Sequence, residues 1–416
     1  MHRIRKIQRA HVVHGSYRDE ILRFIFLLIL IFIIAIAPLN KTKADEYLEG
    51  PADINDFEIE DCSISLQQVP IIDAVAAIVM DAETGRVLFE KNAYSKRAIA
   101  STTKIMTGII AIEMGNFDDE VTISKNASRI WGSVIDLQQD EKLTLEELLY
   151  GLMISSGNDA AIAIAEHIGG TLENFLEMMN KKARLIGARN TNFKSPHGLD
   201  IEGHYSTAYD LALITRYALG NPIFSKIVAT KQVAIPRRNL YNTNEMLEMY
   251  QGANGVKTGY TGKAGRCLVT SATRDGKKLI SVVLNCPSRY KRAESSRKIL
   301  DYAFNNYTKY TLLEPGEIFG YLPVVKGMDI SVPIGTVDKI VYPLTEEEFK
   351  RLEKKIWLYE SFNAPVFAGI EAGYIKFMLD GRVIAESKLK TWNDIARKDF
   401  RYYLDEIIKH WLKLGS

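Results

Sequence analysis

The first group of residues able to carry chemistry is Ser101-Thr102-Thr103-Lys104, which leads directly into the apolar run 105–110. If this segment begins a helix, residues three apart share one face, and the Lys104 amine lies one turn from the Ser101 hydroxyl. A lysine can accept a serine proton when desolvation or a neighbouring cation lowers the lysine pKa. The apolar helix would supply the desolvation, and its N-terminus favours the developing negative charge. The segment therefore predicts an activated serine nucleophile.

By itself, the Ser-x-x-Lys pattern is weak because it occurs four times, at Ser101, Ser288, Ser295 and Ser387. Only Ser101 opens a long apolar helix. The other three lie among charged residues or in a β-rich segment, where a surface serine near a lysine is the better interpretation.

Two further groups add polar side chains. Ser156-Gly157-Asn158 follows the apolar run 148–154, where a turn between helical segments could direct a hydroxyl and an amide into a cleft. The alternative is a helix N-cap. Lys257-Thr258-Gly259 is the only Lys-(Ser/Thr)-Gly in the chain. A lysine and a hydroxyl on one strand, with Gly259 permitting close approach, suit an anionic substrate group; a turn or edge strand with an exposed lysine is the alternative.

The elements around these groups predict an α+β domain. Residues 71–90 are expected to form two strands around a turn at 81–85. Two more strands, at 266–273 and 279–285, are joined through Arg274-Asp275-Gly276-Lys277, a hairpin pattern. Helical periodicity covers 101–115, 145–168, 171–187 and 207–219. Strands at both ends with helices between them indicate one antiparallel sheet that unites the two ends and packs against a helical cluster.

A second, smaller unit follows. Short apolar runs separated by Pro and Gly predict a small all-β domain at 311–390, in which the charged insert 345–355 is expected to be a solvated loop more often than a helical turn. The last segment, 391–416, contains a helix with apolar residues at spacings of three and four and basic residues off that face. Such a helix can lie in a membrane interface; packing on the β domain or on a partner is the alternative. The apolar positions are Phe400, Tyr403, Leu404, Ile407, Ile408, Trp411 and Leu412.

The N-terminus indicates export. A basic stretch precedes the apolar run 24–37, which is shorter than the roughly 20 residues of a membrane-spanning helix and fits a signal peptide over 1–44 with cleavage after Ala44. An uncleaved anchor that includes Ile21 and Leu22 is the alternative. An acidic spacer, 45–68, leads to the first domain at 69–310. The body of the protein is expected outside the cytoplasm, at the outer face of the cytoplasmic membrane or in the cell-wall space.

Composition excludes several classes of function. Residues 1–44 hold eight of the 53 Lys and Arg but two of the 51 Asp and Glu, so the rest of the chain is slightly acidic and no nucleic-acid partner is expected. Cys62, Cys267 and Cys286 make no disulfide framework; buried free thiols are favoured over one bridge. The chain has no CxxC, HExxH or Cys/His cluster, so neither a metal nor another cofactor is expected.

The three groups occur in the order and the structural contexts that are typical of serine penicillin-recognising enzymes. The chain resembles the D-alanyl-D-alanine carboxypeptidases among the low-molecular-weight penicillin-binding proteins. The segments that carry this resemblance are 81–93, 155–170, 190–199, 204–212, 257–265 and, in the β domain, 362–384. Ile99 departs from the family, in which proline is common two residues before the serine; this should alter the approach loop and not the chemistry. The resemblance implies a β-lactamase/transpeptidase-like domain, a small β domain and a membrane-associating helix.

The resemblance also implies roles for single residues. Ser101 would attack the carbonyl between the terminal D-alanines of a peptidoglycan stem peptide, and Lys104 would accept its proton, kept neutral partly by Lys257. Ser156 and Asn158 would relay a proton to the leaving D-alanine and orient the substrate amide.

At the other end of the substrate, Lys257 and Thr258 would hold the terminal carboxylate, beside the close approach that Gly259 permits. The N–H groups of Ser101 and Tyr260 would form an oxyanion hole. Arg292 is the best match for the carboxylate-binding arginine of the family, and Arg289 is the alternative. Water would then release the shortened peptide, and β-lactam antibiotics are expected to be inhibitors.

Two competing hypotheses are testable. A class A β-lactamase needs a deacylating glutamate, usually in a Glu-x-x-Leu-Asn loop, and the segment 173–180 misses that pattern; a penicilloyl adduct that lasts seconds or less would favour it. A non-catalytic wall-binding or sensor protein would keep the fold, and unchanged D-alanine release by Ser101→Ala would exclude Ser101 as the nucleophile. A Ser-His-Asp hydrolase lacks support because no Gly-x-Ser-x-Gly is present.

Overall fold

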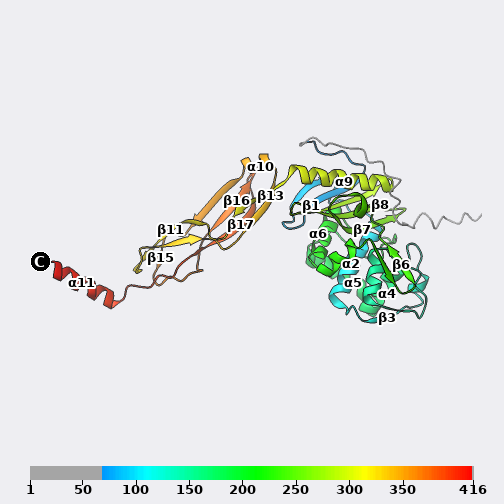
Figure 1. Ribbon diagram of the computed structural model, residues 1–416, viewed down its shortest axis with the longest axis horizontal. Coiled ribbons are helices and arrows are strands. Elements are labelled where there is room, and N and C mark those ends of the chain that lie inside the picture. Colours follow the sequence, from blue (N-terminus) through cyan, green and yellow to red (C-terminus); the bar gives the residue numbers. More distant parts are fainter. Residues whose placement is uncertain (1–67, 415–416) are drawn as a thin grey trace, which may run out of the picture. The chain divides into compact units, whose positions relative to one another are not determined.

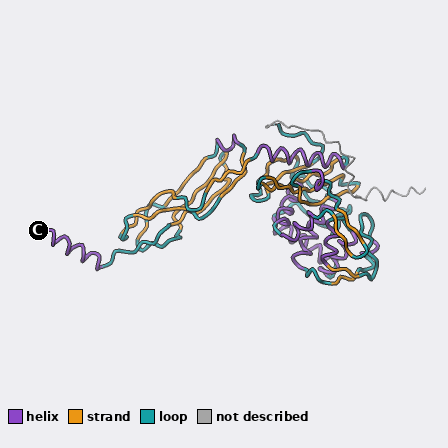
Figure 2. Tube along the Cα trace, in the orientation of Figure 1, coloured by secondary structure: helices purple, strands orange, loops and turns teal. Residues whose placement is uncertain are grey.

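The computed structural model describes residues 68–414. The predicted signal peptide, Cys62 and all but the last residue of the acidic spacer lie outside the described residues. Within the described part, helices and strands are mixed up to about residue 306, and strands predominate from there to residue 391 (Figure 2). This confirms the predicted α+β class.

An antiparallel sheet forms the centre of the first domain, in the order β2-β1-β9-β8-β7. The turn at 81–86 joins β1 to β2, and β8 joins β9 through Asp275-Gly276 as the hairpin pattern predicts. The sheet therefore brings the start of the domain beside its end. The strands are β1 (Ala76–Asp81), β2 (Val87–Lys91), β7 (Ala253–Thr261), β8 (Gly265–Arg274) and β9 (Lys277–Cys286).

One face of this sheet packs against the helical cluster. Alternate strand residues such as Ile78, Val269 and Val282 share a buried core with Met106 and Leu148 of the helices. The helical pattern predicted over 145–168 is interrupted at 154–157, so two helices replace one. The helices are α2 (Lys104–Met114), α3 (Leu145–Met153), α4 (Asn158–Gly169), α5 (Leu172–Ile186), α6 (Ala208–Leu219), α7 (Pro222–Ala229) and α8 (Met246–Met249), with two short hairpins, β3 (Glu120–Thr122) with β4 (Lys142–Thr144) and β5 (Gln232–Ile235) with β6 (Arg238–Tyr241).

The other face of the sheet is covered by α9 (Arg289–Asn306) (Figure 1). Ile299, Leu300 and Ala303 of this helix pack on Val79 and Val283 of the sheet in a second buried core. Cys267 and Cys286 are buried free thiols, as favoured from the sequence. Burial raises the pKa of Cys286 to about 12, which keeps this thiol protonated.

The β domain has its own apolar core, which includes Leu322, Val332 and Phe377. Its larger sheet has the order β14-β16-β17-β12-β11-β15. The charged insert 345–355, expected to be a loop, instead forms a short helix with a capping box and the start of β14. The elements are β10 (Thr308–Leu313), β11 (Ile318–Val325), β12 (Ser331–Gly335), β13 (Ile340–Leu344), α10 (Glu346–Lys350), β14 (Glu353–Leu358), β15 (Phe362–Asn363), β16 (Glu371–Leu379) and β17 (Arg382–Thr391), followed by α11 (Phe400–Leu414).

Candidate active site

Ser101 lies in a 3₁₀ turn, η3 (Ala100–Thr103), that leads into α2. Ala100 has φ of 47°, a conformation that is uncommon for a residue with a side chain. Two hydrogen bonds hold the turn: the Thr102 hydroxyl donates to the Ile99 carbonyl at 2.6 Å, and the Thr103 hydroxyl donates to the Ala100 carbonyl at 2.8 Å. The surrounding structure therefore fixes a strained backbone directly before the serine.

The Lys104 side chain is fully buried, and its amine lies near hydroxyl, amide and carbonyl oxygen atoms. Its amine is 2.8 Å from Ser101 Oγ and 2.6 Å from Asn158 Oδ1. It also lies 3.1 Å from the His197 carbonyl and 3.5 Å from Ser156 Oγ. Burial disfavours the ammonium form, and a neutral amine at 2.8 Å from the hydroxyl can accept its proton.

Ser156, in the turn between α3 and α4, and Asn158, the first residue of α4, both reach this lysine. Ser156 adopts φ of 63° and is almost completely buried. The Asn158 amide nitrogen donates to the Trp131 carbonyl at 2.8 Å, which leaves its Oδ1 directed at Lys104. The turn thus places a hydroxyl and an oriented amide beside the Ser101–Lys104 pair.

Asp159 supports this turn, and the sequence analysis did not identify it. Its buried carboxyl accepts backbone N–H bonds from Ile135, Leu137 and Ala160 at 2.9 to 3.1 Å. Burial raises the Asp159 pKa, although these hydrogen bonds act in the opposite direction. The carboxyl ties the loop that carries Trp131 to the start of α4. An acidic residue in the first turn of an apolar helix was the available sequence pattern.

Lys257, Thr258 and Gly259 lie on β7, at the edge of the sheet next to the serine turn. A Cβ at Gly259 would lie 2.9 Å from the Ser101 nitrogen, closer than real Cβ atoms come, and 3.1 Å from the Thr102 nitrogen, tighter than most real contacts. Glycine therefore allows this strand to pass close to Ser101. Lys257 is buried, and its amine donates to the Thr258 carbonyl at 3.1 Å. Tyr260 follows on the same strand, with the Arg266 guanidinium 3.7 Å from its ring centre.

Arg292 is fully buried on α9, and its guanidinium donates two hydrogen bonds of 2.8 Å to the Glu245 carboxylate. Close to Glu245 in the chain, the Thr243 hydroxyl lies 2.7 Å from the Thr258 hydroxyl. Arg292 is thus connected to the Thr258 side chain through the segment 243–245, which the sequence analysis missed.

A buried histidine also supports the serine turn. His204 Nδ1 accepts the Lys194 N–H at 3.0 Å, so the proton of the neutral ring is on Nε2, which donates to the Thr103 hydroxyl at 2.8 Å. Burial lowers the pKa of His204 to about 4, so the ring is neutral near pH 7. The two hydrogen bonds from His204 to Thr103 and from Thr103 to the Ala100 carbonyl stabilise the unusual backbone of Ala100.

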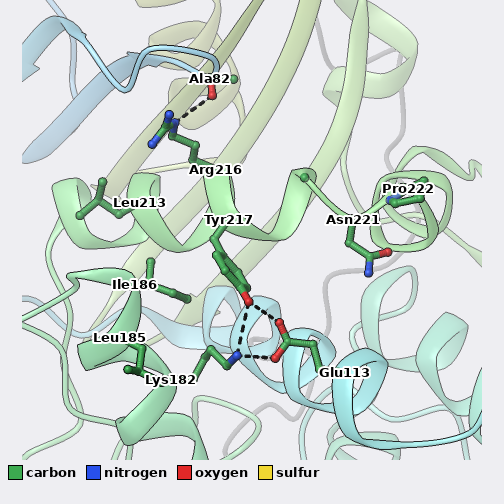
Figure 3. Close-up of a pocket in the computed structure, with 11 residues that line it drawn as sticks. Ala82, Glu113, Lys182, Leu185, Ile186, Leu213, Arg216, Tyr217, Asn221 and Pro222 are labelled. Atoms are coloured by element: carbon green, nitrogen blue, oxygen red, sulfur yellow. Dashed lines mark hydrogen bonds and ion pairs between the residues drawn. The ribbon is translucent and has the colours of Figure 1, made fainter. Parts of the chain in front are cut away.

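A partly open cavity of about 840 Å³ lies elsewhere, lined by residues of α2, α5 and α6 (Figure 3). Here Lys182 pairs with Glu113 at 2.5 Å, and the Tyr217 hydroxyl donates to the same carboxylate. Burial opposes the change, but the hydrogen bond to Glu113 raises the Lys182 pKa, so this lysine stays charged. In this cavity the charge of Lys182 is compensated by Glu113, and none of the site residues above lines the cavity.

Residues 68–414 contain no cluster of three or more His, Cys, Asp or Glu that could bind a metal ion. No helix in this part combines the length and the apolar character that crossing a membrane requires.

Comparison with known proteins decides the family. A family model described as D-alanyl-D-alanine carboxypeptidase matches residues 64–288, more than half of the chain. The chain belongs to the D-alanyl-D-alanine carboxypeptidase family. A second family model, the C-terminal domain of penicillin-binding protein 5, matches residues 307–397. The protein is thus a serine peptidase of the penicillin-binding class, with the β domain that accompanies it.

Individual relatives agree. The D-alanyl-D-alanine carboxypeptidase DacF of Bacillus subtilis is 35% identical over 352 residues, which cover 82% of this chain and 90% of the relative. DacA of Haemophilus influenzae is 33% identical over 375 residues, which cover 86% of this chain and 94% of that relative. The crystal structure of penicillin-binding protein 5 from Haemophilus influenzae superposes with a TM-score of 0.70 and 31% identity, over 80% of this chain and all of that one.

Proposed function

We propose that Ser101 is the nucleophile of a D-alanyl-D-alanine carboxypeptidase that shortens peptidoglycan stem peptides. Ser101 Oγ bonds to the carbonyl carbon between the two terminal D-alanines while Lys104 accepts its proton. The C–N bond then breaks, the proton passes to the leaving amine, and D-alanine departs from an acyl-enzyme. Water attacks the ester, regenerates the Ser101 hydroxyl and releases the shortened peptide.

The observation that carries this proposal is the 2.8 Å contact between the half-buried Ser101 hydroxyl and the fully buried Lys104 amine. Ser156 lies within reach of the same amine, so it is placed to pass the proton to the leaving group. Asn158, fixed by Trp131, is placed to orient the substrate amide. In this proposal the N–H groups of Ser101 and Tyr260 stabilise the oxyanion, for which one donor is worth roughly 3–4 kcal/mol.

The carboxylate of the substrate binds at β7 in this proposal, against Lys257 and Thr258. Arg292 was expected to contact that carboxylate, and its pairing with Glu245 supports a second possibility, in which it positions Thr258 through the segment 243–245. Replacing Arg292 by Lys and comparing peptides that end in a carboxylate or a carboxamide separates the two. A loss confined to the carboxylate peptide favours direct contact, whereas equal losses favour positioning.

The test of the nucleophile uses a pentapeptide ending in D-Ala-D-Ala together with penicillin. Ser101→Ala should abolish D-alanine release and remove the penicilloyl adduct from the peptide containing residue 101, as located by mass spectrometry. Ser387→Ala, in another Ser-x-x-Lys, is the matched control and should retain both. Release by Ser101→Ala at the wild-type rate would refute the proposal. An adduct that is hydrolysed within seconds would favour a β-lactamase instead.

We also propose that the protein acts outside the cytoplasm and that α11 holds it on the membrane surface. Seven apolar side chains on this helix are between 43% and 78% exposed, and such a cluster is unusual on the surface of a soluble protein. Ile407→Glu with Trp411→Glu should then reduce sedimentation with phospholipid vesicles at least tenfold. Unchanged sedimentation would exclude α11 as the membrane contact.

A further inference from the structure

The turn between β11 and β12 has an unusual composition for an exposed turn. Residues 325–330 read Val-Lys-Gly-Met-Asp-Ile, and the side chains of Val325, Met328 and Ile330 are 46%, 50% and 83% exposed. Polar residues and glycine dominate most surface turns. The turn between β16 and β17 in the same domain follows that rule with Asp380-Gly381. The apolar turn 325–330 therefore needs an explanation beyond folding.

This turn is held in one shape before any partner binds. The Val324 N–H donates to the Ile330 carbonyl at 2.9 Å and closes the turn. A Cβ at Gly327 would lie 2.7 Å from Val324 Cγ1 and 2.9 Å from Ile395 Cγ2, so glycine lets the turn pack directly on the segment before α11. Side chains presented by an ordered turn lose little further backbone freedom on binding.

The turn is bonded to the segment that leads into α11. The Met328 N–H donates to the Ala396 carbonyl at 2.8 Å, and the Lys398 N–H donates to the Lys326 carbonyl at 2.9 Å. An isolated β-bridge joins Gly327 to Arg397. Since α11 begins at Phe400, the turn lies beside the start of the helix that is proposed to contact the membrane.

Charge around this junction suits an anionic surface. Lys326, Arg397, Lys398 and Arg401 lie within the turn or next to the helix start. The nearby acids are fewer than these four basic residues: Asp394 accepts from the Ala368 N–H at 2.7 Å, and Asp399 accepts from the Tyr402 N–H at 3.0 Å. Asp329 is the acid within the turn itself. Basic side chains beside exposed apolar ones favour the headgroup region of anionic phospholipid.

We propose that the turn 325–330 is a second membrane contact, which inserts Met328 and Ile330 into the lipid interface beside α11. This inference rests on the proposed membrane binding of α11. A single amphipathic helix leaves the β domain free to rotate about the helix start. A second contact bonded to residues 396–398 fixes the orientation of the β domain on the membrane.

The experiment uses the chain from Asp45 onward, which retains every described element, and vesicles of phosphatidylglycerol and phosphatidylcholine. Met328→Ser with Ile330→Ser should weaken vesicle binding about tenfold while melting temperature and D-alanine release stay unchanged. The matched control is Val337→Ser with Val383→Ser, which removes side chains that are 59% and 47% exposed and that follow β12 and begin β17. This control should bind within twofold of wild type.

A second measurement reports contact directly. Ile330→Trp should show blue-shifted fluorescence from the new side chain and quenching by brominated lipid. The inference would be overturned if Met328→Ser with Ile330→Ser bound vesicles like wild type and Ile330→Trp showed no quenching. That result would leave the α11 proposal intact. A turn variant that changes the sedimentation coefficient without vesicles would assign the turn to self-association and would also overturn it. If Ile407→Glu with Trp411→Glu leaves binding unchanged, the α11 proposal itself fails.

Discussion

The Ser-x-x-Lys pattern at Ser101 and the same pattern at Ser387 differ in whether the serine and the lysine are in contact. The first begins a helix, where residues three apart share a face, and its hydroxyl and amine are 2.8 Å apart. The second lies in β17, where residues three apart point to opposite faces of the sheet. The Ser387 hydroxyl instead donates to Asp338 at 2.6 Å. Local backbone geometry thus separates a chemical pair from a structural one.

A third match shows that helical spacing alone is insufficient. Ser288 caps α9 by accepting the Lys291 N–H, while the Lys291 amine pairs with Glu294 at 2.9 Å and with Asp73 at 3.2 Å. The hydrogen bond to Glu294 raises the Lys291 pKa, so this amine stays protonated and cannot act as a base. Lys104 differs because it is buried and lies among hydroxyl, amide and carbonyl oxygens. The comparison shows that helical spacing must be combined with burial of the amine beside the hydroxyl before a lysine is suited to the proposed role of base.

The largest effect is expected from removing this base. Lys104→Gln should lower the second-order rate of acylation by penicillin about 10³-fold, because the serine proton loses its acceptor. Lys390→Gln is the control in the strand and should stay within twofold of wild type. Acylation is measured by mass spectrometry of the intact protein. A Lys104→Gln rate within tenfold of wild type would contradict the assigned base.

The second effect concerns the close approach of β7. Gly259→Ala should lower kcat/KM for the pentapeptide about 10²-fold, because the added methyl group would displace the strand from the serine turn. Gly220→Ala, after α6, is the control; its nearest contact would be the Tyr217 carbonyl at 3.2 Å. Equal activity of both variants would show that the strand tolerates displacement.

The third effect is on the loop that orients Asn158. Asp159→Asn should lower the free energy of unfolding by about 1–3 kcal/mol, because one of its carboxyl oxygens becomes a donor facing backbone N–H groups. Asp136→Asn, at an exposed position in the same loop, should change it little. Urea denaturation measures both. An unchanged midpoint for Asp159→Asn would mean that the loop is held by other contacts.

The effect that is smallest near neutral pH is the pH dependence that His204 contributes. Its folded pKa of about 4 lies below the ordinary value of about 6.5, so the unfolded chain binds the proton more readily between these pH values. Stability should therefore fall as pH decreases from about 6.5 to about 4, with up to about 1.4 kcal/mol per pH unit from this group.

His204→Gln should flatten that decrease in chemical denaturation across the same pH range. His410→Gln, at an exposed position on α11, serves as the control and should leave the slope unchanged. A steeper decrease in the His204 variant would contradict the neutral, buried state of this ring.

Prediction from the sequence succeeded where the information is local. The contact of Lys104 with Ser101 follows from helical spacing, and the turn between β8 and β9 follows from Asp275-Gly276. The helix α9 was missed because charged and polar residues occupy most of its positions, and only a narrow face with Ile299 and Leu300 is apolar. Such a face becomes recognisable as buried only once the sheet it covers is known.

The sequence by itself determined the order of the three polar groups, the alternation that builds the sheet, and the helical spacing that pairs a hydroxyl with an amine. These depend on neighbours a few residues apart, and local backbone geometry settles them. Only the tertiary structure decided that Asn158, His197 and Ser156 surround Lys104, and that Asp159 and His204 hold the segments behind them. These contacts join residues tens of positions apart, and their hydrogen bonds acquire their strength from the burial that packing alone provides.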